Sequence, residues 1–240
     1  MSKKIGSALI LLGFLAAFLL LIAGPLYRWQ LLELGVAFTL LRWAAYVGVA
    51  AVVFIIVYLI WKRPRGARLA MLTLAAVAAF VSFYLPYQQL QTARSVPPIH
   101  DISTDLEQPP KFDAIAPLRA DAPNPVAYPG EETAKQQREA YPDLAPMYVQ
   151  QNQAQVFDAA MTVVKSMGWQ LVASDREAGR IEATASTFWF GFKDDVVIRL
   201  RTENAQTRVD IRSKSRVGRS DVGKNAARIE RFQQQLQGQL

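Results

Sequence analysis

Three long stretches without a charged residue occupy the first third of this 240-residue chain. They run from Ile5 to Ala23, from Trp43 to Trp61 and from Leu69 to Leu85. A helix of nineteen residues is about 28 Å long, which is enough to cross the hydrocarbon core of a bilayer. Because lipid offers the backbone no hydrogen-bond partners, each stretch is predicted to be a transmembrane helix.

A few residues decide where the first helix is predicted to end and where the second is predicted to begin. Gly24-Pro25 is expected to end the first helix. A cleaved signal peptide is the alternative for this stretch, but the run is long for one, and Pro25 stands where cleavage needs small residues. Residues 31–41 are apolar apart from Glu33. They either extend the second helix or lie along the membrane surface.

Positive charges predict the orientation. Four basic residues lie in the short connection 62–68, and Lys3-Lys4 precede the first helix. Such residues stay in the cytoplasm. The N-terminus is therefore expected in the cytoplasm and everything after Leu90 on the opposite side. In a bacterium with two membranes, this describes a multi-pass inner-membrane protein with a periplasmic C-terminal domain.

Charge and composition exclude several classes of function. Residues 1–90 hold eight Lys/Arg and one acid, whereas residues 91–240 hold nineteen of each. The pI of 9.7 therefore belongs to the membrane part, which argues against nucleic-acid binding. The absence of cysteine and the single histidine, His100, exclude thiol chemistry and a multi-His metal site, so no metal or cofactor is expected. Without ionisable groups inside the spans, transport by this chain alone is not expected.

Residues 91–149 form a separate segment that contains ten of the thirteen prolines. Such a density predicts extended chain without central strands, with a short helix over Glu131–Ala140. Nine acids against five basic residues make the segment acidic, whereas residues 150–240 hold fourteen basic residues and ten acids. We therefore expect a membrane domain 1–90, a Pro-rich segment 91–149 packed on the domain that follows, and a folded domain 150–240.

The folded domain is predicted to be a two-layer α+β sandwich, with a helix, four antiparallel strands and a second helix. Apolar residues at helical spacing predict the first helix, and Ser220 is expected to cap the second. Asp194-Asp195 is interpreted as a turn, with the two side chains pointing to opposite faces. The predicted helix and strands span residues 154–167, 169–173, 181–187, 196–202 and 208–214.

Several separated motifs of this chain form a recognisable set: Trp189-Phe190-Gly191-Phe192-Lys193-Asp194-Asp195-Val196-Val197, the stretch 209–221, the stretch 100–105 with Pro109-Pro110, and the stretch 136–143. Together these motifs resemble the family of domain of unknown function 1499 (DUF1499). The resemblance extends from His100 to Leu236, and the three spans are similar to those of membrane-bound members. Many members carry Pro-Asn-Cys, where this chain has Asn124-Pro125 without cysteine. The resemblance supports the domain boundaries and implies no activity.

The densest cluster of reactive groups is His100, Asp101, Ser103, Thr104 and Asp105. These residues could supply a general base or a carboxylate site for a hard cation. Turn chemistry, in which such side chains bond nearby backbone, is the favoured interpretation. His100, Asp101 and Asp105 are therefore weak catalytic candidates.

Basic residues give the candidate anion site, which consists of Arg212, Arg216, Arg219 and Ser220. Stretch 216–221 ends a strand and starts a helix, where free N–H groups bind anions; a capped helix start is the alternative. The outer sheet face carries further cations, which either bind an anion, pair with Glu182 and Asp210, or are covered by the acidic segment. These further cations are Arg199, Arg201, Arg208 and Lys214.

An aromatic run, Phe188, Trp189, Phe190 and Phe192, completes the candidates. Alternation points two of these rings toward the core. The others could touch the membrane or a partner, but packing in the core is the favoured interpretation.

The leading functional hypothesis is a membrane-tethered binding domain whose partners are the bilayer and an anionic lipid, a glycan or another envelope protein. One alternative is an envelope hydrolase or lyase that acts on an anionic substrate with His100 and Asp101 or Asp105. The other alternative is a structural subunit of a membrane complex.

Overall fold

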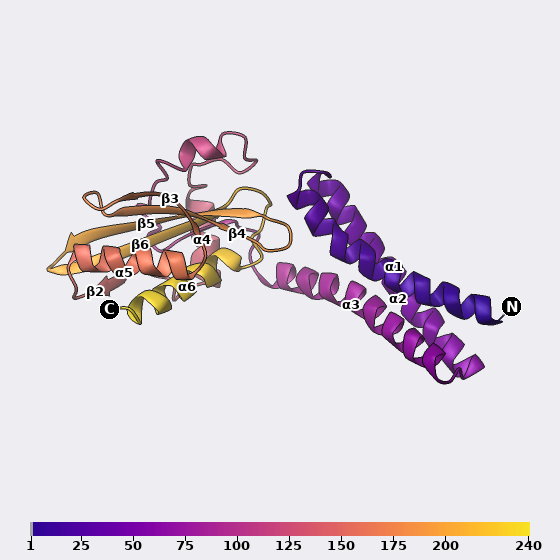
Figure 1. Cartoon of the computed structure of the whole chain (residues 1–240). Coiled ribbons are helices and arrows are strands. Elements are labelled where there is room, and N and C mark those ends of the chain that lie inside the picture. The colour runs from indigo at the N-terminus through magenta and orange to yellow at the C-terminus, as the bar shows by residue number, and fades with distance from the viewer. Residues whose placement is uncertain (1) are drawn as a thin grey trace. The chain divides into compact units, whose positions relative to one another are not determined.

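The structure, a computed structural model, describes residues 2–240 (Figure 1). Contacts divide the chain into two units. One comprises Met1–Thr92 together with the short loop Phe188–Gly191, and the other comprises Ala93–Thr187 and Phe192–Leu240.

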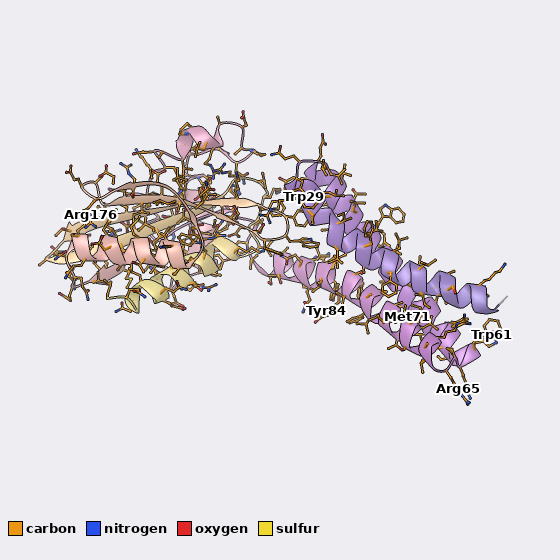
Figure 2. All side chains as sticks on the ribbon, viewed as in Figure 1. Trp29, Trp61, Arg65, Met71, Tyr84 and Arg176 are labelled. Atoms are coloured by element: carbon orange, nitrogen blue, oxygen red, sulfur yellow. The ribbon has the colours of Figure 1, made fainter. Side chains whose placement is uncertain are left out.

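The first unit is built from three helices, α1 (Ser2–Arg28), α2 (Leu34–Lys62) and α3 (Ala67–Ser95). Each is long and apolar enough to cross a membrane, so the prediction of three membrane helices is confirmed. Of the stretch 31–41, residues 34–41 belong to α2, whereas residues 31–33 lie in the connection before it. Figure 2 shows Trp29 and Trp61 at opposite ends of this helical unit, and both are largely exposed, as in the aromatic belts of membrane proteins.

The prediction that Gly24-Pro25 ends the first helix was wrong. The α1 helix continues through Pro25 to Arg28. Proline removes one N–H from the ladder and leaves the carbonyl four residues earlier without its helical partner. Membrane helices tolerate such a break where neighbouring groups bond the freed carbonyl.

Small residues allow these helices to approach closely. A Cβ added at Gly13 would lie 2.5 Å from the carbonyl oxygen of Ala75, and one added at Gly48 would lie 2.6 Å from that of Ala79. Close backbone contact of this kind replaces the hydrophobic driving force that helices lack inside lipid. Larger side chains pack nearby in a cluster of Ile55, Tyr58, Leu72 and Ala75.

The second unit is an antiparallel sheet with two helices on one face (Figure 1). The predicted α+β sandwich is confirmed, although the sheet has six strands in place of four. The strand order is β1-β6-β5-β4-β3, and β2 also pairs with β6. The elements foreseen from the sequence are α5 (Gln153–Ser166), β3 (Gln170–Asp175), β4 (Arg180–Ser186), β5 (Lys193–Glu203), β6 (Gln206–Ser215) and α6 (Lys224–Gln237).

The Pro-rich segment contributes the two additional strands, β1 (Asp101–Ser103) and β2 (Met147–Val149). Both pair with β6, at different positions along it. Both strands lie at the edge of the sheet, are only three residues long and contain no proline, so they are compatible with the expectation that no central strand forms here. The segment also holds a short 3-10 helix η1 (Ala116–Arg119) and the helix α4 (Glu131–Ala140).

Strand alternation separates the two faces of the sheet. Val196, Ile198 and Leu200 of β5 join Val209 and Ile211 of β6 in the core beneath the helices. The residues between them point to the opposite face, which is rich in charge. This alternation follows directly from the two-residue period of a strand.

Two local predictions need correction. The last helix begins at Lys224, with Gly223 at its N-cap in place of Ser220. The carboxylate of Asp221 accepts the backbone N–H groups of Gly223 and Asn225, at 2.9 and 2.6 Å, so Asp221 does the capping that was assigned to Ser220. Asp194-Asp195 lies inside β5 and is not a turn.

Candidate functional site

The charged face of the sheet contains three clusters of ion pairs, each built around buried carboxylates. In the first, Asp101 of β1 meets two cations of β6. The guanidinium of Arg212 donates to both carboxylate oxygens of Asp101, at 2.9 and 2.8 Å, and Lys214 Nζ lies 2.7 Å from Oδ2. Asp101 and Lys214 are fully buried, and this burial lowers the pKa of Lys214 against the opposing effect of Asp101.

The second cluster surrounds Asp195 of β5. Arg119 of η1 donates to Asp195 Oδ2 at 2.6 Å, and Arg216 donates to both oxygens at 2.8 Å. The hydroxyl of Thr184 donates to Oδ1 at 2.7 Å. Because Arg119 comes from the Pro-rich segment, this cluster joins that segment to the sheet.

The third cluster combines two carboxylates with three arginines. Asp105 and Asp210 are both buried, and they share Arg199, Arg201 and Arg208 at distances from 2.8 to 3.4 Å. The other oxygen of Asp105 accepts two backbone N–H groups in the turn that follows it. Both oxygens of this carboxylate are therefore occupied.

The charged face also binds the backbone of the Pro-rich segment. Arg212, Lys214 and Arg216 donate to four carbonyl oxygens of the segment, those of Pro110, Leu118, Val126 and Ala127. Glu182 accepts three consecutive backbone N–H groups, those of residues 113, 114 and 115. An extended chain rich in proline leaves its carbonyls without partners of its own, and buried carbonyls need donors. The basic residues of the sheet supply these donors.

A polar cleft of about 360 Å³ opens beside the third cluster. Its volume lies within the range of small-molecule sites. Tyr148 of β2 lies next to the cleft, because it pairs with Arg208 across the sheet and its ring stands 5.9 Å from that guanidinium. About half of the Tyr148 surface is exposed. The cleft is lined by Asp105, Glu107, Gln108, Arg201, Thr202, Glu203 and Arg208.

The structure separates the catalytic candidates chosen from the sequence. Asp101 and Asp105 belong to two different clusters of ion pairs. His100 Nδ1 donates to the carbonyl of Arg219, at 3.3 Å. Burial lowers the pKa of His100, and the bond to Arg219 opposes this effect.

The candidate anion site is likewise divided. Arg212 and Arg216 bind different carboxylates, Asp101 and Asp195. Ser220 accepts the N–H of Val222, and its hydroxyl lies 3.5 Å from the carbonyl of Pro97. The structure therefore does not gather Arg212, Arg216, Arg219 and Ser220 around one ligand.

Sequence reasoning missed the residues of the cleft. Glu107, Gln108, Thr202 and Glu203 lie in two segments about a hundred residues apart, and no motif connects them. One signal was available: Arg201 and Arg208 were placed on the outer sheet face, and the turn between β5 and β6 brings them together. The acidic partner, Asp105, could not be assigned without the tertiary structure.

Three membrane helices followed by an α+β domain with a polar cleft define a membrane-anchored protein with one folded polar domain. Residues 101–236 match the family described as protein of unknown function (DUF1499), so the chain belongs to this family. The match confirms the resemblance inferred from the motifs and covers most of the second unit. No curated protein matches the chain.

Proposed function

We propose that this chain is a membrane-anchored binding protein whose α+β domain holds a hydroxyl-rich ligand, a glycan of the cell envelope, in the cleft beside Asp105. The observation that carries the proposal is the lining of this cleft. Glu107, Gln108 and Thr202 are exposed there, whereas Arg212, Lys214 and Arg216 are already bonded to the chain itself.

The chemistry of the lining favours a neutral or amine-bearing sugar. Three carboxylates face two guanidinium groups around the cleft, so a polyanion would meet like charge. Hydroxyl groups both donate and accept hydrogen bonds, and they can therefore satisfy carboxylates and guanidinium groups together. The half-exposed ring of Tyr148 adds a flat apolar surface beside these polar groups.

The hydrogen bonds of Asp105 support a binding function in preference to acid–base catalysis. Asp105 accepts hydrogen bonds on both oxygens, from three arginines and two backbone N–H groups. A carboxylate occupied in this way is poorly placed to take a proton from a substrate.

The proposed location follows from the distribution of positive charge. The basic connection between α2 and α3 lies in the cytoplasm, and the α+β domain lies on the other side of the inner membrane, in the periplasm of a bacterium with two membranes. Envelope glycans are found in that compartment, where the cleft would meet them.

Calorimetric titration of the full-length protein in lipid nanodiscs tests this proposal. The probes are a neutral tetrasaccharide of N-acetylglucosamine, its deacetylated amine-bearing form and a sulfated oligosaccharide. We expect at least one of the first two to bind, and the sulfated probe to bind more weakly.

Glu203→Gln is expected to reduce that affinity about tenfold, which corresponds to about 1.4 kcal/mol. Glu177→Gln changes an exposed acid in the turn between β3 and β4 and is expected to leave the affinity unchanged. The proposal fails if neither neutral nor amine-bearing sugar binds, if the sulfated probe binds best, or if both variants behave alike.

A further inference from the structure

The loop between β4 and β5 carries four aromatic residues, Phe188, Trp189, Phe190 and Phe192. Its base is closed by two hydrogen bonds between Thr187 and Phe192, each 2.9 Å long. Gly191 has a φ of +67°, a conformation that glycine adopts without a steric penalty. The loop therefore presents its aromatic tip in a defined shape.

The tip of this loop belongs to the same unit as the membrane helices. Within that unit, the indole Nε1 of Trp189 donates to the carbonyl of Leu21 at 3.1 Å. Leu21 stands four residues before Pro25, so its carbonyl is the acceptor that the proline leaves without a helical N–H. The side chain of Trp189 replaces the missing donor.

Gly24 makes room for this contact. A Cβ at position 24 would lie 2.7 Å from the indole ring, which no real Cβ tolerates. Pro25 therefore leaves the carbonyl of Leu21 without a helical N–H, and Gly24, which has no side chain, leaves room for the indole ring beside that carbonyl. The ring of Phe190 lies 6.0 Å from that of Tyr27 and 5.9 Å from that of Phe38.

These contacts lie at the level where the membrane should end. The uncharged run of α1 ends at Tyr27, and Arg28-Trp29 follows, so that aromatic and basic residues stand together there as they do at bilayer interfaces. Phe188, at the tip of the same loop, is 91% exposed. Leaving a whole phenylalanine side chain in water is unfavourable, and acyl chains would cover it at this level.

We propose that Phe188–Gly191 is a membrane anchor, in which Trp189 caps the Leu21 carbonyl freed by Pro25 and Phe188 inserts into the lipid of the bilayer interface. Hydrogen bonding in this site fixes the loop, and the exposed ring provides the lipid contact. The exposed surface of Phe188 is covered by the same bilayer that the three helices cross.

The absence of cysteine from the chain makes a direct test possible. Phe188→Cys carries a nitroxide in the full-length protein, reconstituted in vesicles of phosphatidylcholine and phosphatidylglycerol. Collision rates with oxygen, which concentrates in lipid, and with a water-soluble nickel chelate are then measured by paramagnetic resonance. The matched control is Ala205→Cys, an exposed site in the turn between β5 and β6.

We expect the ratio of oxygen to nickel collisions to be several-fold higher at position 188 than at position 205. Equal ratios would place the loop in water and overturn the proposal. Protection from both reagents, with spin–spin broadening, would identify a second copy as the occupant and would also overturn it.

Trp189→Phe tests the hydrogen bond separately, since it keeps a ring and removes the indole N–H. This variant is expected to lower the collision ratio at position 188 while circular dichroism stays unchanged. An unchanged ratio would reject the role given to Trp189.

Discussion

The guanidinium of Arg212 donates to both carboxylate oxygens of Asp101, at 2.9 and 2.8 Å, and the two side chains are almost completely buried. The two residues are separated by 111 positions in the chain. Their strands, β1 and β6, are adjacent and antiparallel. The pair therefore joins the start of the α+β domain to a strand near its end.

Asp101→Asn should destabilise the domain by about 3–5 kcal/mol, because it leaves Arg212 and Lys214 buried without their carboxylate. Urea unfolding of the full-length protein in nanodiscs, followed by circular dichroism, measures the change. Asp143→Asn removes an exposed carboxylate and should alter the free energy of unfolding by less than about 0.5 kcal/mol. Equal effects of the two variants would contradict the importance of the buried pair.

Glu182→Gln should loosen the Pro-rich segment. The carboxylate of Glu182 accepts the N–H groups of residues 113, 114 and 115, and hydrogen bonds to a charged group contribute about 1.5–3 kcal/mol. Trypsin should therefore cleave after the buried Arg119 on the order of ten times faster in this variant than in the unchanged protein. Glu177→Gln is the control, and rapid cleavage at Arg119 in the unchanged protein would show that the segment is not held against the sheet.

Two glycines of α2 offer a matched comparison for helix packing. Gly48→Ala places a Cβ 2.6 Å from the Ala79 carbonyl oxygen, whereas a Cβ at Gly35 meets nothing within 4 Å. We expect Gly48→Ala to destabilise the helical unit by about 1–3 kcal/mol. Gly35→Ala should be neutral or stabilising by up to about 1 kcal/mol. Thermal unfolding in detergent distinguishes them, and a neutral result at Gly48 would argue against this close contact.

We expect His100 to lower the free energy of unfolding as the pH falls below neutrality. Burial lowers its pKa in the folded protein below the ordinary 6.5, so the unfolded chain binds a proton more readily. The neutral side chain is compatible with the fold above pH 6.5, and stability is lost as the pH falls below this value toward the folded pKa.

The nearby Asp221 has the opposite effect on the pH dependence of stability. Burial raises its pKa above 3.8, so the folded protein binds the proton more readily and gains stability as the pH falls. Comparison of the unchanged protein with His100→Gln between pH 7.5 and 5 isolates the histidine. Urea unfolding should show a smaller loss of stability in the variant, and identical pH profiles would refute the effect.

Local patterns were sufficient for the long helices and for four of the six strands, whereas β1 and β2 were not predicted. The alternation of Val209 and Ile211 with charged neighbours predicted β6 and the direction of its side chains, because a strand repeats every two residues. The same reasoning placed Asp194 and Asp195 on opposite faces, as the structure has them, although it treated them as a turn. The failures fell where the chain breaks a local rule, as at Pro25, whose freed carbonyl is bonded by Trp189.

The site was much less accessible to prediction than the fold. The sequence placed Arg212 on the outer face and Arg216 just beyond it, but it did not identify their partners, Asp101 and Asp195. It also gave no indication that the cleft lies between Glu107 and Glu203. Such pairs depend on the register of distant strands and on the path of an irregular segment, and no short-range pattern encodes either.

By itself, the sequence determined that the chain has three membrane helices and an α+β domain. Uncharged runs of bilayer length and two-residue alternation each have one favourable solution, whatever the rest of the molecule does. Only the tertiary structure decided which buried charges neutralise one another. A buried charge is stabilised by the partner a few ångströms away in space, and that partner is selected by folding, not by distance along the chain.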